Sequence, residues 1–211
     1  MINSKKIFFL FIMILFFVLQ YTLISCDNYT PEEKKYIEHL KKHREKIDIE
    51  MRDSSNSPFN HKEKIEFHPL KYFEPNFDFI FKGKLTKYTK QDTVTIYGTK
   101  GEERKTIRYG FLNLKNDKYK LKINVYESLS RDGKTKYYGI WFTDKTTGKE
   151  SYGVGRYLDF ELNPDSNYIY TVDFNYAYNP YCSYSPHYSC AIPTKEDYLD
   201  IAIKAGEKRF H

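Results

Sequence analysis

The sequence predicts a mainly β fold, an antiparallel meander that forms a barrel-like or sandwich domain, with an N-terminal amphipathic helix before it. Apolar and polar residues alternate over many short segments between residues 77 and 203, which is the period of half-buried strands. Polar turns such as Arg131-Asp132-Gly133 separate these segments. The 21 Tyr and 16 Phe residues also favour strands. No long helical pattern alternates with the strands, so a parallel α/β fold is not expected.

Residues 1–25 have the pattern of a secretory signal peptide. Lys5 and Lys6 precede an apolar run over residues 7–19, which is shorter than the roughly 18 residues of a membrane-spanning helix. The segment Leu23-Ile24-Ser25-Cys26 resembles the bacterial lipobox, which implies that Cys26 is the lipidated first residue of the mature chain. We therefore expect a bacterial lipoprotein of the cell envelope, held to a membrane by its N-terminal lipid. The alternative is an ordinary signal peptide, or an uncleaved anchor, with an incidental cysteine; the membrane leaflet is left open.

The charged residues of the remaining chain alternate in sign. The formal charge is +6 at pH 7, and cleavage of the signal peptide removes two of the basic residues. Nucleic-acid-binding proteins gather basic residues into a patch or a stripe. Since no such block is present, no nucleic-acid partner is expected.

After a tether over residues 26–30, residues 31–211 are expected to form a single domain that begins with a helix. The segment Thr30-Pro31-Glu32-Glu33 combines a helix N-cap, Pro at the first helical position and Glu at the third. Apolar residues then recur near four-residue spacing, which predicts an amphipathic helix over residues 31–52. His39 and His43 are four apart, but without an accompanying Glu motif a packing or solvated role is favoured over metal binding.

The segment from residue 53 to residue 76 connects this helix to the β domain, residues 77–211. A Ser- and Asn-rich break is expected first, then a short helix near residues 60–65, then an irregular strap that packs on the core. Residues with period-two alternation follow. Strands are expected around residues 77–81, 94–96, 107–111, 119–125, 138–142, 152–160, 168–172 and 199–203.

A set of short motifs resembles the family known as domain of unknown function 1684. The motifs are Ser57-Pro58, Phe67 with Leu70-Lys71-Tyr72-Phe73, Asp144 with Thr147-Gly148, Ser151-Tyr152-Gly153-Val154-Gly155-Arg156-Tyr157-Leu158, Asp173-Phe174-Asn175, Ala177-Tyr178-Asn179-Pro180-Tyr181-Cys182, Cys190 with Ile192-Pro193, and Ala205-Gly206-Glu207. The resemblance covers residues 40 to 210. Ala191 and Ser151 depart from its usual Pro and Thr. The family implies no activity.

The Gly-bracketed Arg156 is the first candidate for ligand binding. Glycines allow close approach of a backbone, and an Arg beside them can hold a carboxylate or a phosphate in a bidentate fork. The alternative is a structural arginine paired with an internal acid such as Asp173 or Glu207. Asp173 and Asn175 alternate out of a strand and are expected on one face, where they would line a ligand site or pair with Arg156.

The Tyr-rich segment after residue 175 is the second candidate region. Tyrosine provides rigid contact area with a polar tip, which suits a carbohydrate-stacking or protein-contact surface, although a loop packed over an open barrel end also needs such residues. The ligand-binding candidates from both regions are Arg156, Tyr157, Asp173, Asn175, Tyr178, Asn179 and Glu207.

Cys182 and Cys190 form an even pair once Cys26 is lipidated. In an exported chain the pair predicts a disulfide, which would stabilise the fold by about 2.5 kcal/mol. Together with His187 they could also bind a metal, but the spacing matches no common zinc module. A reactive thiol is the third alternative.

Three functional hypotheses remain at this stage. The leading one is a non-catalytic envelope module that binds an unknown small molecule or envelope component. The second is a hydrolase-type enzyme that uses the face of Arg156, Asp173 and Asn175, and the third is a structural protein without a small-molecule site. No catalytic residue, cofactor or metal is expected from a recognisable motif, and His187 is a weak candidate for a general base.

Overall fold

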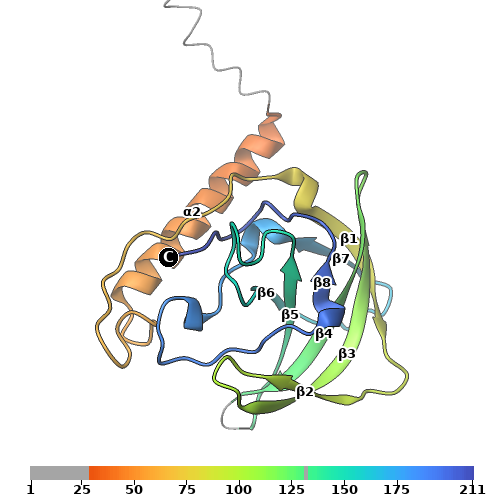
Figure 1. The fold of residues 1–211 in the computed structure, drawn as a ribbon. Helices are drawn as coiled ribbons and strands as arrows, with labels where there is room; N and C mark the ends of the chain where they lie inside the picture. The colour runs from red at the N-terminus through yellow and green to blue at the C-terminus, as the bar shows by residue number, and fades with distance from the viewer. Residues whose placement is uncertain (1–28, 131–132) are drawn as a thin grey trace, which may run out of the picture. The chain divides into compact units, whose positions relative to one another are not determined.

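The computed structural model describes residues 29–130 and 133–211, and the chain divides into two compact units, residues 1–38 and 39–211 (Figure 1). The predicted signal peptide, Cys26 and most of the tether lie outside the described residues, as does part of the expected turn at Arg131-Asp132-Gly133. No helix within the described part of the chain is long and apolar enough to cross a membrane.

The helix α2 spans Pro31–Asp53, one residue beyond the predicted end. The capping pattern explains its start, because the Glu33 backbone N–H donates to Thr30 Oγ1 (3.2 Å) and the Thr30 N–H donates to Glu33 Oε2 (2.7 Å). Within the second unit, Leu40 is completely buried. The Arg44 guanidinium donates to the Phe73 carbonyl, and Asp48 accepts the Leu70 N–H, so the strap is tied to the helix.

The second unit is built on a mainly antiparallel sheet that forms a half-barrel, which confirms the predicted fold class. The strand order is β6-β5-β4-β3-β1-β7, with β2 paired to β3 and β8 paired to β5. Every pairing is antiparallel except that of β8 with β5. The strands are β1 (Ile80–Lys87), β2 (Thr93–Tyr97), β3 (Glu103–Lys115), β4 (Lys120–Leu129), β5 (Lys136–Asp144), β6 (Arg156–Phe160), β7 (Ile169–Asp173) and β8 (Tyr198–Leu199).

Strand alternation sorts side chains between the two faces of the sheet. One face carries the main core, which includes Phe81, Ile123 and Phe142. The opposite face carries a smaller cluster of Ile96, Tyr126, Trp141 and Ala191, with Val94 and Tyr157 packed against it. A third cluster lies at the helix and strap, with Phe59, Leu70, Tyr184 and Phe210 at its centre.

Four local predictions differ from the structure. No helix forms near residues 60–65, because Asn60 donates to the Arg52 and Ser54 carbonyls and holds the segment as turns. Phe77–Phe79 is the short 3-10 helix η1, since the Asn76 side chain accepts the Asp78 N–H and caps it. Regular pairing in the region 152–160 begins only at Arg156. The last strand is reduced to Tyr198–Leu199 and is parallel to β5.

Candidate ligand-binding site

Strand β6 gives the two faces of the sheet different chemistry. Leu158 and Phe160 belong to the main core, and Arg156 is completely buried with them. Tyr157 and Asp159 alternate with these residues and lie on the opposite face. Within this motif, Arg156 therefore lies in the closed interior and Tyr157 lies on an accessible surface.

The Arg156 guanidinium is held in a closed network. Nη2 donates to Asp144 Oδ2 (2.8 Å) and to the Ile203 carbonyl (2.8 Å), and neither side chain of the ion pair is exposed. Nη1 donates to the main-chain carbonyls of Ala205 and Glu207. Burial lowers the pKa of the Arg156 side chain, and the Asp144 carboxylate opposes this effect. Every hydrogen bond of this guanidinium thus ends on the protein.

This geometry corrects the expected surroundings of Arg156. Its acidic partner is Asp144, neither Asp173 nor the Glu207 carboxylate, and Glu207 contributes only its backbone oxygen. Gly155 explains the position of the motif: at φ 115° it lies so close to β5 that a Cβ atom would be 2.5 Å from the Phe142 carbonyl oxygen. The guanidinium is a structural centre of the half-barrel in this arrangement and lines neither of the two cavities described below.

Asp173 and Asn175 are not presented side by side on a strand face. Asp173 caps the 3-10 helix η2 (Phe174–Tyr176), and its Oδ1 accepts the Asn175 backbone N–H (2.9 Å) and an Asn175 side-chain N–H (2.9 Å). The Asn175 amide then pairs with both backbone groups of Asn76, at 2.8 and 2.9 Å. These two residues fasten the strap to the end of β7.

An open cleft of about 550 Å³ lies on the face of Tyr157. Trp141 stacks on Tyr126 with ring centroids 4.8 Å apart, and the Tyr157 hydroxyl donates to the Ala191 carbonyl (2.5 Å). Both rings are therefore fixed in the wall. Six Tyr and Trp side chains line this aromatic cleft: Tyr137, Trp141, Tyr157, Tyr178, Tyr181 and Tyr188.

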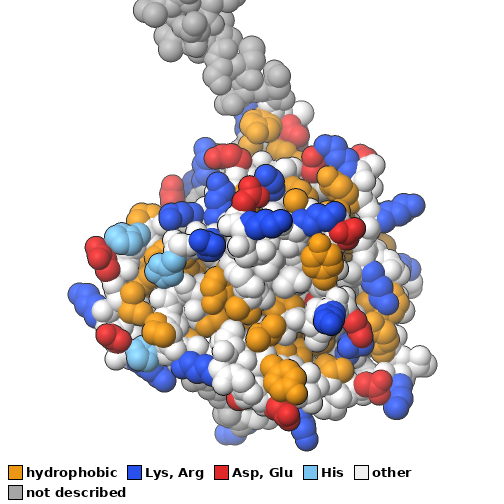
Figure 2. All heavy atoms as spheres, viewed as in Figure 1, with side chains coloured by type: hydrophobic (Ala, Val, Ile, Leu, Met, Phe, Trp, Pro, Cys, Tyr) orange, Lys and Arg blue, Asp and Glu red, His pale blue; other side chains and the backbone are white. Residues whose placement is uncertain are grey.

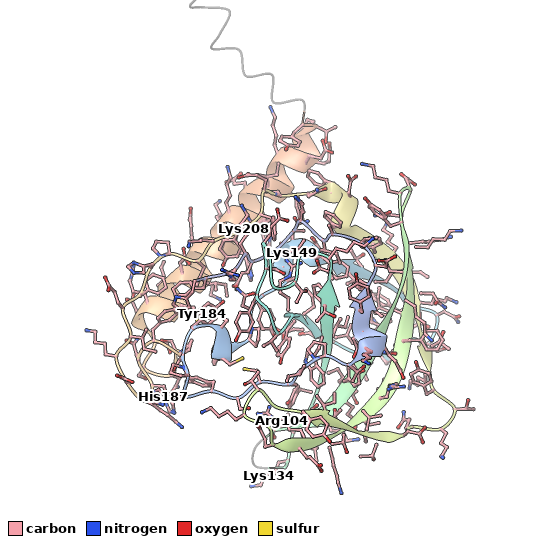
Figure 3. All side chains as sticks on the ribbon, in the orientation of Figure 1. Arg104, Lys134, Lys149, Tyr184, His187 and Lys208 are labelled. Atoms are coloured by element: carbon pink, nitrogen blue, oxygen red, sulfur yellow. The ribbon has the colours of Figure 1, made fainter. Side chains whose placement is uncertain are left out.

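Polar groups border the aromatic cleft. The Tyr178 hydroxyl donates to Asp159 Oδ1 (2.7 Å), and Arg104 is fixed by Glu102 and the Ser189 carbonyl. Burial raises the pKa of Tyr178, and Asp159 adds to this effect, so the hydroxyl stays protonated. Arg104 lies at the start of β3 and His187 lies in the segment between Cys182 and Cys190, and both are in the lower part of the view in Figure 3. The space-filling view shows hydrophobic side chains open to solvent beside Lys, Arg and His side chains (Figure 2).

A second cavity of about 770 Å³ adjoins the aromatic cleft and shares Asn56, Leu158, Asp159, Tyr178 and Tyr181 with it. We call it the acid cavity, because Glu207 lines it while being only 2 % exposed. Its remaining walls come from the helix, the segment that connects the helix to the sheet and the segment after β7: His43, Arg44, Ile47, Glu50, Met51, Ser54, Ser57, Tyr72, Asn175, Tyr176 and Ala177.

The remaining candidate, Asn179, does not line this cavity but holds the carboxylate of Glu207, which does. Its backbone N–H donates to Glu207 Oε2 (2.9 Å), and its side-chain amide donates to the Lys208 carbonyl (2.8 Å). Of the predicted candidates, Asn175, Tyr178 and Glu207 line the acid cavity, and Tyr157 and Tyr178 line the aromatic cleft.

Cys182 and Cys190 are free thiols in the structure, and the Cys182 backbone N–H donates to Cys190 Sγ (3.2 Å). A hydrogen bond from Cys190 lowers the pKa of Cys182 to about 6, although burial opposes this. The His187 imidazole contacts Glu63 Oε2 (2.9 Å). Among the described residues, no group of three or more His, Cys, Asp or Glu side chains is placed to hold a metal ion.

The cleft residues that were not predicted are Tyr137, Asp159 and Arg104, together with the buried partner Asp144. Strand alternation could have predicted part of the cleft wall, because Trp141 on β5 pairs with Tyr157 on β6 and the two side chains lie on the same face of the sheet. Arg104 joins the cleft only through the fold of β2 and β3, which no local pattern reveals.

Residues 65–208 match the model of a family described as "Protein of unknown function (DUF1684)". No curated protein matches the chain. A similar solved structure is the solution NMR structure of an uncharacterized protein of Haloarcula marismortui, with 26 % sequence identity and a TM-score of 0.60, covering 84 % of this chain and 96 % of that one.

Proposed function

The chain belongs to the DUF1684 family of proteins of unknown function, and from this premise we propose that it is an envelope lipoprotein whose aromatic cleft binds a ligand without catalysing a reaction. The observation that supports binding is the set of six Tyr and Trp side chains that line an open volume of about 550 Å³. Ligand sites in proteins commonly have volumes of roughly 300–1,000 Å³ and combine apolar walls with a few placed polar groups.

The chemistry of the wall favours a carbohydrate. Aromatic rings offer flat apolar surfaces, and tyrosine adds a hydroxyl at the edge of each ring. The C–H face of a pyranose ring stacks on such a surface, while its hydroxyls form hydrogen bonds with polar side chains such as Asp159 and Arg104. Because the main aromatic walls are held by Tyr126, Ala191 and Asp159, little ordering is required on binding.

Trp141 is the chain's single tryptophan, and it lines the cleft, so its fluorescence reports binding there without a label. Titration of the mature chain with a panel of neutral and charged oligosaccharides is expected to change the emission in a saturable way for at least one sugar. The variant Tyr137→Ala removes an exposed cleft residue, and Tyr97→Ala is the matched control, because Tyr97 is 55 % exposed and lines neither cavity.

The proposal predicts that Tyr137→Ala weakens binding by about tenfold, near the loss of one stacking contact, and that Tyr97→Ala leaves it unchanged. Absence of a response to every sugar, or an equal loss in both variants, contradicts carbohydrate binding in this cleft.

The membrane anchor is the second part of the proposal. Cys26 would bear the lipid, and residues 27–30 would connect it to the helix. A single acyl chain binds a bilayer only marginally, whereas the several chains that the lipobox resemblance implies hold stably. Mass spectrometry of the mature protein tests this directly, since a free Cys26 on a cleaved chain contradicts the anchor.

The third part concerns Cys182 and Cys190. We propose that an envelope thiol-disulfide oxidoreductase oxidises this pair: the two thiols lose two protons and two electrons to the disulfide of the oxidoreductase, which leaves as a dithiol. The contact between the Cys182 N–H and Cys190 Sγ supports this. Cys190 lines the aromatic cleft, so the bond would brace that wall. Non-reducing mass spectrometry of exported protein measures the linkage.

A further inference from the structure

Glu207 is fixed in the acid cavity by its backbone. Its N–H donates to the Ala177 carbonyl (2.8 Å), and it forms a β-bridge with Tyr72 of the strap. Gly206 makes this close approach possible: it has a φ of 74°, and a Cβ atom there would lie 2.5 Å from the Ala177 carbonyl oxygen. The fold therefore brings a carboxylate to the cavity wall and holds it there.

The two oxygens of this carboxylate have different surroundings. Oε2 accepts the Asn179 backbone N–H (2.9 Å) and the Tyr184 hydroxyl. Oε1 accepts no hydrogen bond from any residue that the structure describes, although the side chain is only 2 % exposed and lines an open volume. Oε1 is not one of the buried side-chain atoms that lack a partner, so this oxygen keeps contact with the cavity and can accept a hydrogen bond from something bound there.

We propose that the acid cavity binds an organic ammonium ligand, with its charged group against Oε1 of Glu207 and its apolar body against Ile47 and Met51. An ammonium group offers three donors and a compensating charge, which matches a buried carboxylate better than a neutral hydroxyl does. Leu158 and Ala177 add to the apolar wall. This inference does not rest on the aromatic cleft and stands whether or not that cleft binds a sugar.

The charges of the cavity also suit a cation. Glu50, Asp159 and Glu207 line it, against the single guanidinium of Arg44. Arg44 is held at the strap, where it lies 4.4 Å from the centre of the Tyr72 ring and donates to the Phe73 carbonyl (3.0 Å). The neighbouring His43 has its pKa lowered, first by burial, and so carries little charge at pH 7.

The ionisation of Glu207 makes binding depend on pH. Burial raises the pKa of Glu207 to about 7, and the hydrogen bonds from Tyr184 and Asn179 and the charge of Arg156 oppose this increase. An ammonium ligand needs the ionised form, so its affinity is expected to be about tenfold higher at pH 8 than at pH 6. The charged and titratable groups around the site are His43, Arg44, Asp48, Glu50, Tyr72, Arg156, Asp159, Tyr176, Tyr178, Tyr181 and Tyr184.

Hexylamine is a suitable probe, because it pairs an ammonium group with an apolar chain, and hexanol is its uncharged counterpart. Ligand-observed NMR on the mature chain is expected to show saturable binding of hexylamine that strengthens from pH 6 to pH 8. The variant Glu207→Gln keeps the acceptor for Tyr184 and Asn179 but removes the charge, and a loss of at least tenfold in hexylamine affinity is expected. Hexanol should bind more weakly, with no dependence on pH.

Two controls separate this site from the aromatic cleft. Tyr137→Ala changes only the cleft and should leave hexylamine binding intact, and sugar binding followed by Trp141 emission should survive in Glu207→Gln. The inference is overturned when hexylamine does not bind, when it binds equally well to the folded Glu207→Gln variant, or when its affinity falls from pH 6 to pH 8.

Discussion

Arg156 and Tyr157 are consecutive residues of β6, yet their side chains serve opposite faces of the sheet. The Arg156 guanidinium is completely buried and bonded to Asp144 at 2.8 Å, whereas the Tyr157 ring lines the aromatic cleft. A period of two along the strand requires this division. The same short motif therefore stabilises the half-barrel through one residue and forms its candidate binding surface through the next.

The buried pair of Arg156 and Asp144 should matter greatly for stability. Asp144→Asn removes the negative partner and leaves a buried guanidinium without a counter-charge, which is expected to lower the free energy of unfolding by about 3–5 kcal/mol. Urea denaturation followed by Trp141 fluorescence measures the loss. Asp92→Asn is the control, since the Lys90–Asp92 pair has side chains 89 % and 63 % exposed and should change stability by less than about 1 kcal/mol. A similar small change in both variants would refute the structural role of Arg156.

Gly155 should tolerate a side chain less well than Gly101, although both glycines have a positive φ. Both Gly155 and Gly101 have φ values that cost other residues roughly 1–2 kcal/mol. A Cβ atom at Gly101 meets nothing within 4 Å, whereas one at Gly155 would approach the Phe142 carbonyl and Pro193. We therefore expect Gly155→Ala to be the more destabilising substitution, by more than that backbone cost alone. Thermal unfolding of the two variants compares them, and equal melting temperatures would contradict the close approach.

The sequence predicted the helix and strands that neighbouring residues along the chain determine. The capping residues at Thr30 and Glu33 and the alternation along the strands led to the helix and to the mainly antiparallel sheet. The failures have non-local causes. Phe77 and Phe79 alternate like a strand but are capped into a turn by Asn76, and the last strand pairs parallel to β5 because of where the chain returns.

The candidate sites were predictable only in part for the same reason. Tyr157 and Tyr178 were identified from the sequence and line the cleft. The partner of Arg156 was not identified, because Asp144 lies at the end of the neighbouring strand β5, twelve residues away along the chain. Arg104 reaches the cleft from β3. Only the register of the sheet brings such distant residues together.

Cys182 should be the more reactive thiol of its pair when the chain is reduced. A hydrogen bond from Cys190 lowers the pKa of Cys182 to about 6, while the same contact, together with burial, raises that of Cys190. Alkylation by iodoacetamide is therefore expected at Cys182 first, with a rate that increases through pH 6 and then levels off. Peptide mass spectrometry measures the modification at each site. Cys190→Ala should move the midpoint upward, and an unchanged midpoint would show that Cys190 is not the cause.

Glu207 should make the folded state less stable as pH rises. Its pKa is raised from the ordinary 4.5 to about 7, chiefly by burial, so between these values the folded chain keeps a proton that the unfolded chain has lost. The contribution of this group is therefore fully present below pH 4.5 and is lost as pH increases to 7, by up to about 3 kcal/mol. Glu207→Gln cannot ionise and should remove this decline. Urea unfolding of both chains at pH 5, 6, 7 and 8 measures the difference, which should grow in favour of the variant with each step up to pH 7. Glu161→Gln, at an exposed position, controls for the loss of one carboxylate. Parallel curves for the wild type and Glu207→Gln would mean that the carboxylate is solvated in the cavity, and this would also remove the reason for an ammonium ligand to bind there.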